Sequence, residues 1–156
     1  MDLDSDQKKL VDQFVKQELL IGELYRLFAM RYFEYRDFWT TMAVEENQHA
    51  ALLKRMVESD TNNRIILSNG ELRSSSLDSS INNLHKIISE FEDDINFPIS
   101  RAVVIALQLE KSLWERKVFQ YFEGDSEDVR KIMTSLNLEQ EIHIKKIDRF
   151  ASRFKK

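Results

Sequence analysis

The chain has no cysteine, one proline and three glycines among its 156 residues. Without cysteine it can form neither a disulfide framework nor a cysteine-ligated zinc or iron–sulfur site. The scarcity of proline and glycine disfavours a turn-rich β-sheet protein and favours long helices. No apolar run approaches the roughly 20 residues that span a bilayer, and the acidic residues 1–6 contain no apolar signal segment. We therefore expect a cytoplasmic helical protein with no membrane partner.

Charge and length limit the class of partner and the number of domains. Lys and Arg number 23 and Asp and Glu number 27, so the formal net charge is −4. A negatively charged chain is a poor match for a phosphate backbone, and we expect no nucleic-acid partner. The length suits one domain over residues 1–156, with a core large enough to be stable without disulfides.

Apolar side chains recur every three or four residues in five stretches, which predicts five helices. We place these helices at residues 6–31, 35–59, 78–94, 98–123 and 127–154. Short connections near residues 32–34 and 124–126 indicate two antiparallel hairpins. Residues 60–77 are predicted to be a loop, with a short extended piece at residues 65–67. The sequence thus predicts an all-α, antiparallel four-helix bundle with a long crossover that carries the helix at residues 78–94.

Two similar runs lie on the second and fourth helices of this predicted bundle: EENQH at residues 45–49 and EQEIH at residues 139–143. Their histidines are 94 residues apart and are two of the three in the chain. Each run follows a helix with one carboxylate on its apolar stripe. Glu18 lies 31 residues before His49, and Glu110 lies 33 residues before His143. The repetition predicts two equivalent hairpins related by a pseudo-two-fold axis through a central site.

Carboxylates on a core-facing stripe need a partner, because their uncompensated removal from water costs several kcal/mol. Glu18, Glu46 and Glu110 all occupy such positions near the middle of their helices. His49 follows Glu46 by three residues, about 60° around the same helix, so both side chains can reach one point. On its own, each of these residues would more commonly be an ordinary paired helix residue.

The fourth helix offers two residues for the same position before His143. Glu139 precedes His143 by four residues and Gln140 precedes it by three. Four helices then present ligand-type residues in the order Glu, Glu-x-x-His, Glu and x-x-x-His, which predicts a metal site; a purely structural polar core is the alternative. Tyr25, two turns after Glu18, is either a phenol near this site or ordinary core, and the isolated His85 is expected to be structural.

These residues resemble the ferritin-like superfamily and, within it, the rubrerythrin-type di-iron domain. The most specific part is AVEENQHA at residues 43–50, followed by Glu18 in ELLIGELY and Glu110 in LEKSL. The resemblance implies a ferritin-like bundle with a di-iron cofactor, and manganese or partial occupancy is the alternative. It implies that Glu18 and Glu110 are terminal or bridging carboxylates and that Glu46 bridges. His49 and His143 would each bind one iron.

The chain departs from this family at Gln140, where the family has a bridging glutamate. A neutral amide is a poor bridge between cations, and Glu139 is the other candidate to complete the set of ligands. Two Fe²⁺ ions carry +4, whereas Glu18, Glu46 and Glu110 supply −3. The sequence therefore leaves three alternatives open: the site binds one ion, it binds two ions weakly, or it has lost metal binding.

The resemblance implies an iron-binding oxidoreductase that acts on peroxide, dioxygen or ferrous iron. Rubrerythrins also carry a four-cysteine, rubredoxin-like iron centre that donates electrons, and this chain has no cysteine. The electron donor is therefore expected to be an external protein, and we also expect a homodimer or a higher homo-oligomer. The alternative from another class is a helical interaction or sensor protein whose metal site, altered at Gln140, has no redox activity. A substrate oxygenase of the same superfamily is a third hypothesis.

Overall fold

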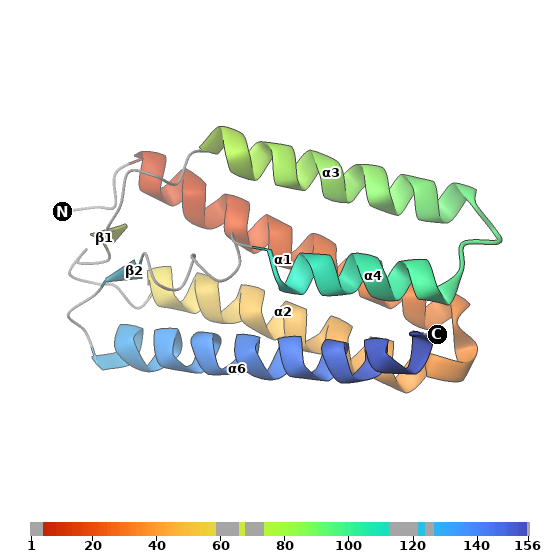
Figure 1. Cartoon of the computed structure of the whole chain (residues 1–156). Coiled ribbons are helices and arrows are strands. Elements are labelled where there is room, and N and C mark those ends of the chain that lie inside the picture. The colour runs from red at the N-terminus through yellow and green to blue at the C-terminus, as the bar shows by residue number, and fades with distance from the viewer. Residues whose placement is uncertain (1–4, 59–65, 68–73, 113–121, 124–126, 156) are drawn as a thin grey trace.

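The structure is a computed structural model that describes residues 5–58, 66–67, 74–112, 122–123 and 127–155. Its helices are α1 (Ser5–Arg31), α2 (Arg36–Glu58), α3 (Ser74–Asp93), α4 (Ile99–Glu110) and α6 (Glu127–Ala151), with the 3-10 turns η1 (Phe33–Tyr35) and η2 (Ser152–Phe154). Two short strands, β1 (Ile66–Leu67) and β2 (Phe122–Glu123), pair antiparallel. The described part of the chain is almost wholly helical, which confirms the predicted all-α class (Figure 1).

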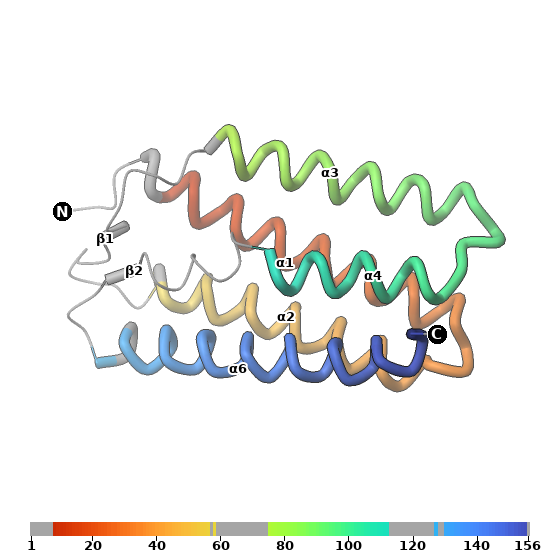
Figure 2. The backbone as a smooth tube through the Cα atoms, viewed as in Figure 1, coloured from red at the N-terminus to blue at the C-terminus, as the bar shows by residue number. Residues whose placement is uncertain are grey.

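The helices lie side by side, with α3 on the outside (Figure 1). Helices α1 and α2 form a hairpin through η1, α6 contacts both α2 and α4, and α3 packs on α1. Figure 2 shows that the α1–α2 connection and the α3–α4 connection lie at the same end of the molecule, opposite the β1–β2 pair. A hydrogen bond from Tyr25 on α1 to Glu110 on α4 joins the α1–α2 hairpin to α4. No helix in the described residues is long and apolar enough to cross a membrane.

Most predicted helix boundaries agree with the structure to within a few residues. The predicted helix at residues 78–94 is present as α3, but it begins at Ser74, so the end of the predicted loop at residues 60–77 is wrong. Ile66–Leu67 is extended, as expected for this part of the crossover. The predicted helix at residues 98–123 is wrong at its C-terminal end, because α4 ends at Glu110 and Phe122–Glu123 is a strand. Pairing with β1 outweighs the helical periodicity there. Residues 113–121 of this predicted helix, and the predicted turn at residues 124–126, lie outside the described residues.

Among the described residues, two apolar clusters make up the core, and polar side chains lie between them. One cluster includes Phe14 on α1 and Leu53 on α2, and the other includes Ile21 on α1 and Met42 on α2. Glu18 lies between Phe14 and Ile21 along α1, so the same helix face changes from apolar to charged and back to apolar. The apolar clusters therefore flank a buried polar segment near the middle of the helices.

Phe28 belongs to the cluster that includes Ile21 and Met42. Its ring is fully buried, with its centroid 4.9 Å from that of Trp39 and 5.0 Å from that of Phe91, so its substitution tests the packing of this cluster. Phe28→Ala should lower the free energy of unfolding by about 3–5 kcal/mol through lost contacts and a cavity. The matched control is Phe33→Ala, since Phe33 is 74% exposed and its removal should cost less than about 1 kcal/mol. Urea denaturation followed by circular dichroism measures both values. Equal losses would contradict this description of the core.

Candidate metal centre

Five side chains from four helices meet in the buried polar segment. They are Glu18 on α1, Glu46 and His49 on α2, Glu110 on α4, and His143 on α6, and we call them the polar cluster. None of them is more than 2% exposed. The apolar stripes explain this convergence, because each residue occupies a core-facing position on its own helix.

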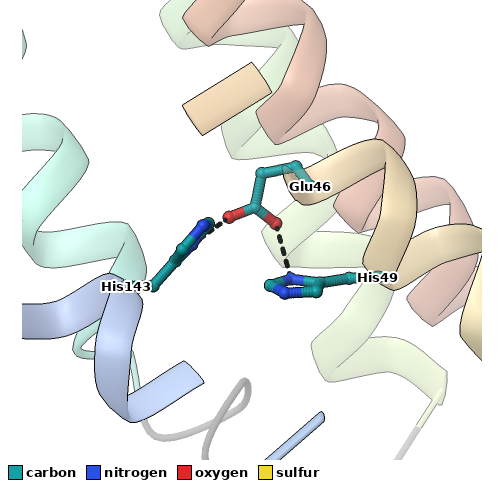
Figure 3. Close-up of side chains that lie close together, drawn as sticks. All are labelled: Glu46, His49 and His143. Atoms are coloured by element: carbon teal, nitrogen blue, oxygen red, sulfur yellow. Dashed lines mark ion pairs between the residues drawn. The ribbon is translucent and has the colours of Figure 1, made fainter. Parts of the chain in front are cut away.

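The carboxylate of Glu46 lies between the two imidazoles of the polar cluster (Figure 3). Its Oε1 is 2.9 Å from Nδ1 of His143, and its Oε2 is 3.5 Å from Nδ1 of His49. One ligand-type atom from each of these three residues lies within 4.8 Å of the others. This buried Glu/His/His group could therefore hold a metal ion.

Glu18 and Glu110 add one carboxylate to each side of this group. Glu18 Oε2 is 3.4 Å from His49 Nδ1, and Glu110 Oε2 is 3.4 Å from His143 Nδ1. Each histidine Nδ1 therefore faces two carboxylates, of which Glu46 is common to both. The five residues that the sequence predicted at core-facing positions thus lie together in space.

The other ring nitrogen of each histidine faces a different carboxylate. His143 Nε2 is 2.5 Å from Glu45 Oε2, and His49 Nε2 is 3.0 Å from Glu139 Oε2. The second contact has the distance of an ion pair but not the geometry of a hydrogen bond. Glu45 and Glu139 occupy equivalent places in the two runs, so each run supplies a carboxylate to the histidine of the other.

Glu139 and Gln140, both predicted as ligands, have different surroundings. The Glu139 side chain is 43% exposed and touches the outer nitrogen of His49. Gln140 is 5% exposed, and neither Oε1 nor Nε2 of its amide has a hydrogen-bond partner among the described residues. A buried amide without partners costs about 1–3 kcal/mol. Gln140 stands three residues before His143, as Glu46 does before His49, so its amide occupies the place matched to the shared carboxylate.

Sequence reasoning missed Glu45 and Lys146 and left two alternatives for Tyr25. Lys146 Nζ donates to Glu45 Oε1 at 2.5 Å, and the Tyr25 hydroxyl donates to Glu110 Oε1 at 2.7 Å. Tyr25 is both core and a partner of the site, because its ring also lies 5.5 Å from that of Trp39. The repeat held a signal for Glu45, which precedes Glu46 as Glu139 precedes Gln140.

The electrostatics of the site centre on His143. Burial lowers the pKa of His143, but Glu110 and then Glu45 raise it by more, so its pKa lies above the ordinary 6.5. Burial raises the pKa of Glu45, but Lys146 and His143 outweigh that effect, so its pKa lies below the ordinary 4.5. Around His143 the negative charge therefore favours a bound cation, which is a proton in the absence of metal.

The raised pKa of His143 predicts a pH dependence for protein treated with a chelator. Protonated His143 should contribute stability that is fully present below pH 6.5 and lost as the pH rises through the raised pKa. Urea denaturation of wild type and His143→Gln at a series of pH values tests this. The difference in unfolding free energy should be largest at the acidic end and shrink as the pH rises. A difference that grows with pH would contradict the assignment.

Comparison of the chain with models of known protein families, with curated protein sequences and with solved structures found no match. The strongest element of the site's geometry is the buried group of Glu46, His49 and His143, which could hold a metal ion.

Proposed function

We propose that the chain is a ferritin-like, rubrerythrin-type di-metal carboxylate protein that binds iron and acts as an oxidoreductase on peroxide, dioxygen or ferrous iron. The observation that carries this proposal is the position of Glu46 between two histidines, with one oxygen toward each Nδ1. A shared carboxylate with one imidazole on each side is an arrangement that suits a pair of metal ions in a helix bundle.

The donor atoms around the shared carboxylate fit iron. One half of the site has His49 Nδ1 with Glu18, and the other half has His143 Nδ1 with Glu110. Carboxylate oxygen combined with imidazole nitrogen suits Fe²⁺ or Mn²⁺, whereas structural zinc favours four tetrahedral ligands. The unpartnered amide of Gln140 adds a neutral oxygen that is available as a ligand. Iron bound here would supply the electrons for reduction of peroxide or dioxygen.

The surrounding residues would hold the ligands in place. Glu45 and Glu139 lie against the Nε2 atoms of the histidines. At His143, the hydrogen bond with Glu45 favours the tautomer with its proton on Nε2 and leaves the Nδ1 lone pair for a metal. Tyr25 orients Glu110 through its hydrogen bond. The two apolar clusters keep water away along the helix axes, which strengthens electrostatic interactions inside the site.

The arrangement of the helices supports the ferritin-like part of the proposal. Hairpin α1–α2 places Glu18, Glu46 and His49 in the polar cluster, and the pair α4 and α6 places Glu110 and His143 there. The segment between the hairpins contains an additional helix, α3. Because the chain has no cysteine for an iron–sulfur centre, the proposal includes an external protein as electron donor. It also includes assembly into a homodimer or a higher homo-oligomer.

Gln140 favours a second candidate function. Its buried neutral amide occupies the place matched to the shared carboxylate, so the site carries one negative charge fewer than a symmetric pair of runs would supply. A helical interaction or sensor protein that binds one ion, or none, and has no redox activity would fit this feature. Metal content separates the two candidates directly.

His49→Ala should remove most of the bound metal from protein purified from iron-supplied cells, because losing a ligand weakens binding by about tenfold or more. The matched control is His85→Ala, since His85 is exposed on α3 and lies outside the polar cluster. Elemental analysis by mass spectrometry measures metal per chain, and circular dichroism shows that both variants are folded. Equal metal content in wild type and His49→Ala would refute the metal centre.

Gln140→Glu should raise the metal content toward two ions per chain and increase peroxide turnover, because it restores a negative charge beside a second divalent ion. Gln48→Glu is the matched control, since Gln48 is exposed on α2. Metal analysis and peroxide consumption with an artificial reductant measure both effects. If wild type already holds two ions and the substitution changes neither quantity, the interpretation of Gln140 as a weakened position is wrong.

A further inference from the structure

A groove of about 790 Å³ opens between the α1–α2 turn and the C-terminal part of α6. Its lining comes from η1, the first turns of α2, and the end of α6 with η2. None of the seven residues predicted as metal ligands lines it. The groove is therefore a feature separate from the proposed metal centre, and its volume lies in the range of small-molecule sites, roughly 300–1,000 Å³.

The floor of the groove is apolar and aromatic. The rings of Phe38 and Phe150 stack with their centroids 3.9 Å apart and their planes at 16°. Tyr35 packs edge-on against Phe150 at 5.4 Å, and Met42 is fully buried beneath the opening. Ile142 on α6 also lines the groove and is 44% exposed. These contacts hold the floor in place and leave apolar surface open to a ligand.

One rim of the groove is basic. Lys145, Arg149 and Arg153 follow one another at intervals of four residues, so they lie along one side of α6 and η2. All three are exposed, and none forms an ion pair with another residue in the described part of the chain. A row of cations without counter-charges beside an apolar floor suits an anion that carries an apolar body.

The distribution of charge across the groove limits how much negative charge the bound anion can carry. Lys146 also lines the groove, which makes four cations, and the opposite rim carries the two acidic residues Glu34 and Asp37. The lining therefore has a net charge of 4 − 2 = +2. The acidic rim repels a head group with several negative charges, whereas one carboxylate can lie on the basic rim alone.

We propose that this groove is a binding site for an amphipathic organic monocarboxylate. Its aliphatic or aromatic body packs on Phe38 and Ile142, which leave apolar surface exposed, and its carboxylate binds Arg149 and Arg153. Lys146 links this site to the polar cluster, because it lines the groove and also donates to Glu45, which contacts His143. Binding in the groove requires no metal, so the test below is independent of the proposed oxidoreductase activity.

Isothermal titration of chelator-treated full chain with decanoate, below its micelle concentration, is the direct test. Decanoate should bind at one site per chain, and decanol and decylammonium should bind at least about tenfold more weakly, because they lack the charge that the arginines recognise. The double variant Arg149→Gln/Arg153→Gln should lower the affinity for decanoate by about tenfold or more. Arg130→Gln, an exposed arginine near the other end of α6, should leave the affinity unchanged.

A second variant tests the apolar part of the groove. Thr41 is exposed and lines it, so Thr41→Trp should fill the groove and abolish decanoate binding with an unchanged melting temperature. Equal binding of the three decyl compounds, or no binding of decanoate to folded wild type, would overturn the proposal. Tighter binding of decyl phosphate than of decanoate would overturn the assignment of a monocarboxylate as the ligand. If wild type does not bind decanoate but forms a dimer that Thr41→Trp dissociates, the proposal is also overturned. The groove would then be an interface between two copies of the chain.

Discussion

The removal of three carboxylates from water is the constraint on which the interior depends. Glu18, Glu46 and Glu110 lie within one buried cluster, and each faces His49, His143 or both. Ionised groups in such a place are strongly unfavourable unless cations or hydrogen-bond donors surround them. Because the partners come from different helices, the cluster restricts how α1, α2, α4 and α6 can be aligned. Apolar residues of similar volume would stabilise the core at least as well, so the buried charge argues for a binding role.

The two halves of the cluster are alike in sequence but have different surroundings. Near His143, Glu45 is half-buried and neutralised by Lys146. Near His49, the equivalent carboxylate of Glu139 is 43% exposed, and no lysine or arginine in the described residues pairs with it. A buried, paired carboxylate holds an imidazole more rigidly than an exposed one. On the proposed function, the two metal positions would accordingly differ in affinity, independently of the missing charge at Gln140.

Periodicity in the sequence predicted most of the site, because burial on a helix follows directly from spacing. Glu46 and Gln140 are buried where their stripes placed them, and Glu139, at a different angle on α6, is partly exposed. The role of Glu45 depends on the distance between α2 and α6, which no single-helix pattern contains. The strand at Phe122–Glu123 was missed for the same reason, since it depends on pairing with β1. Local patterns thus predicted which residues are buried, and tertiary contacts decided which residues meet.

On the proposed function, the polar cluster binds metal through the Nδ1 atoms of both histidines. Anomalous X-ray diffraction from crystals grown with Mn²⁺ tests it most directly, because the signal locates the metal independently of the protein atoms. We expect an anomalous peak inside the cluster, bonded to Glu46 and to Nδ1 of His49 or His143, with a second peak on the other side of Glu46 if both positions fill. Peaks confined to exposed carboxylates, with none beside Glu46, would contradict it.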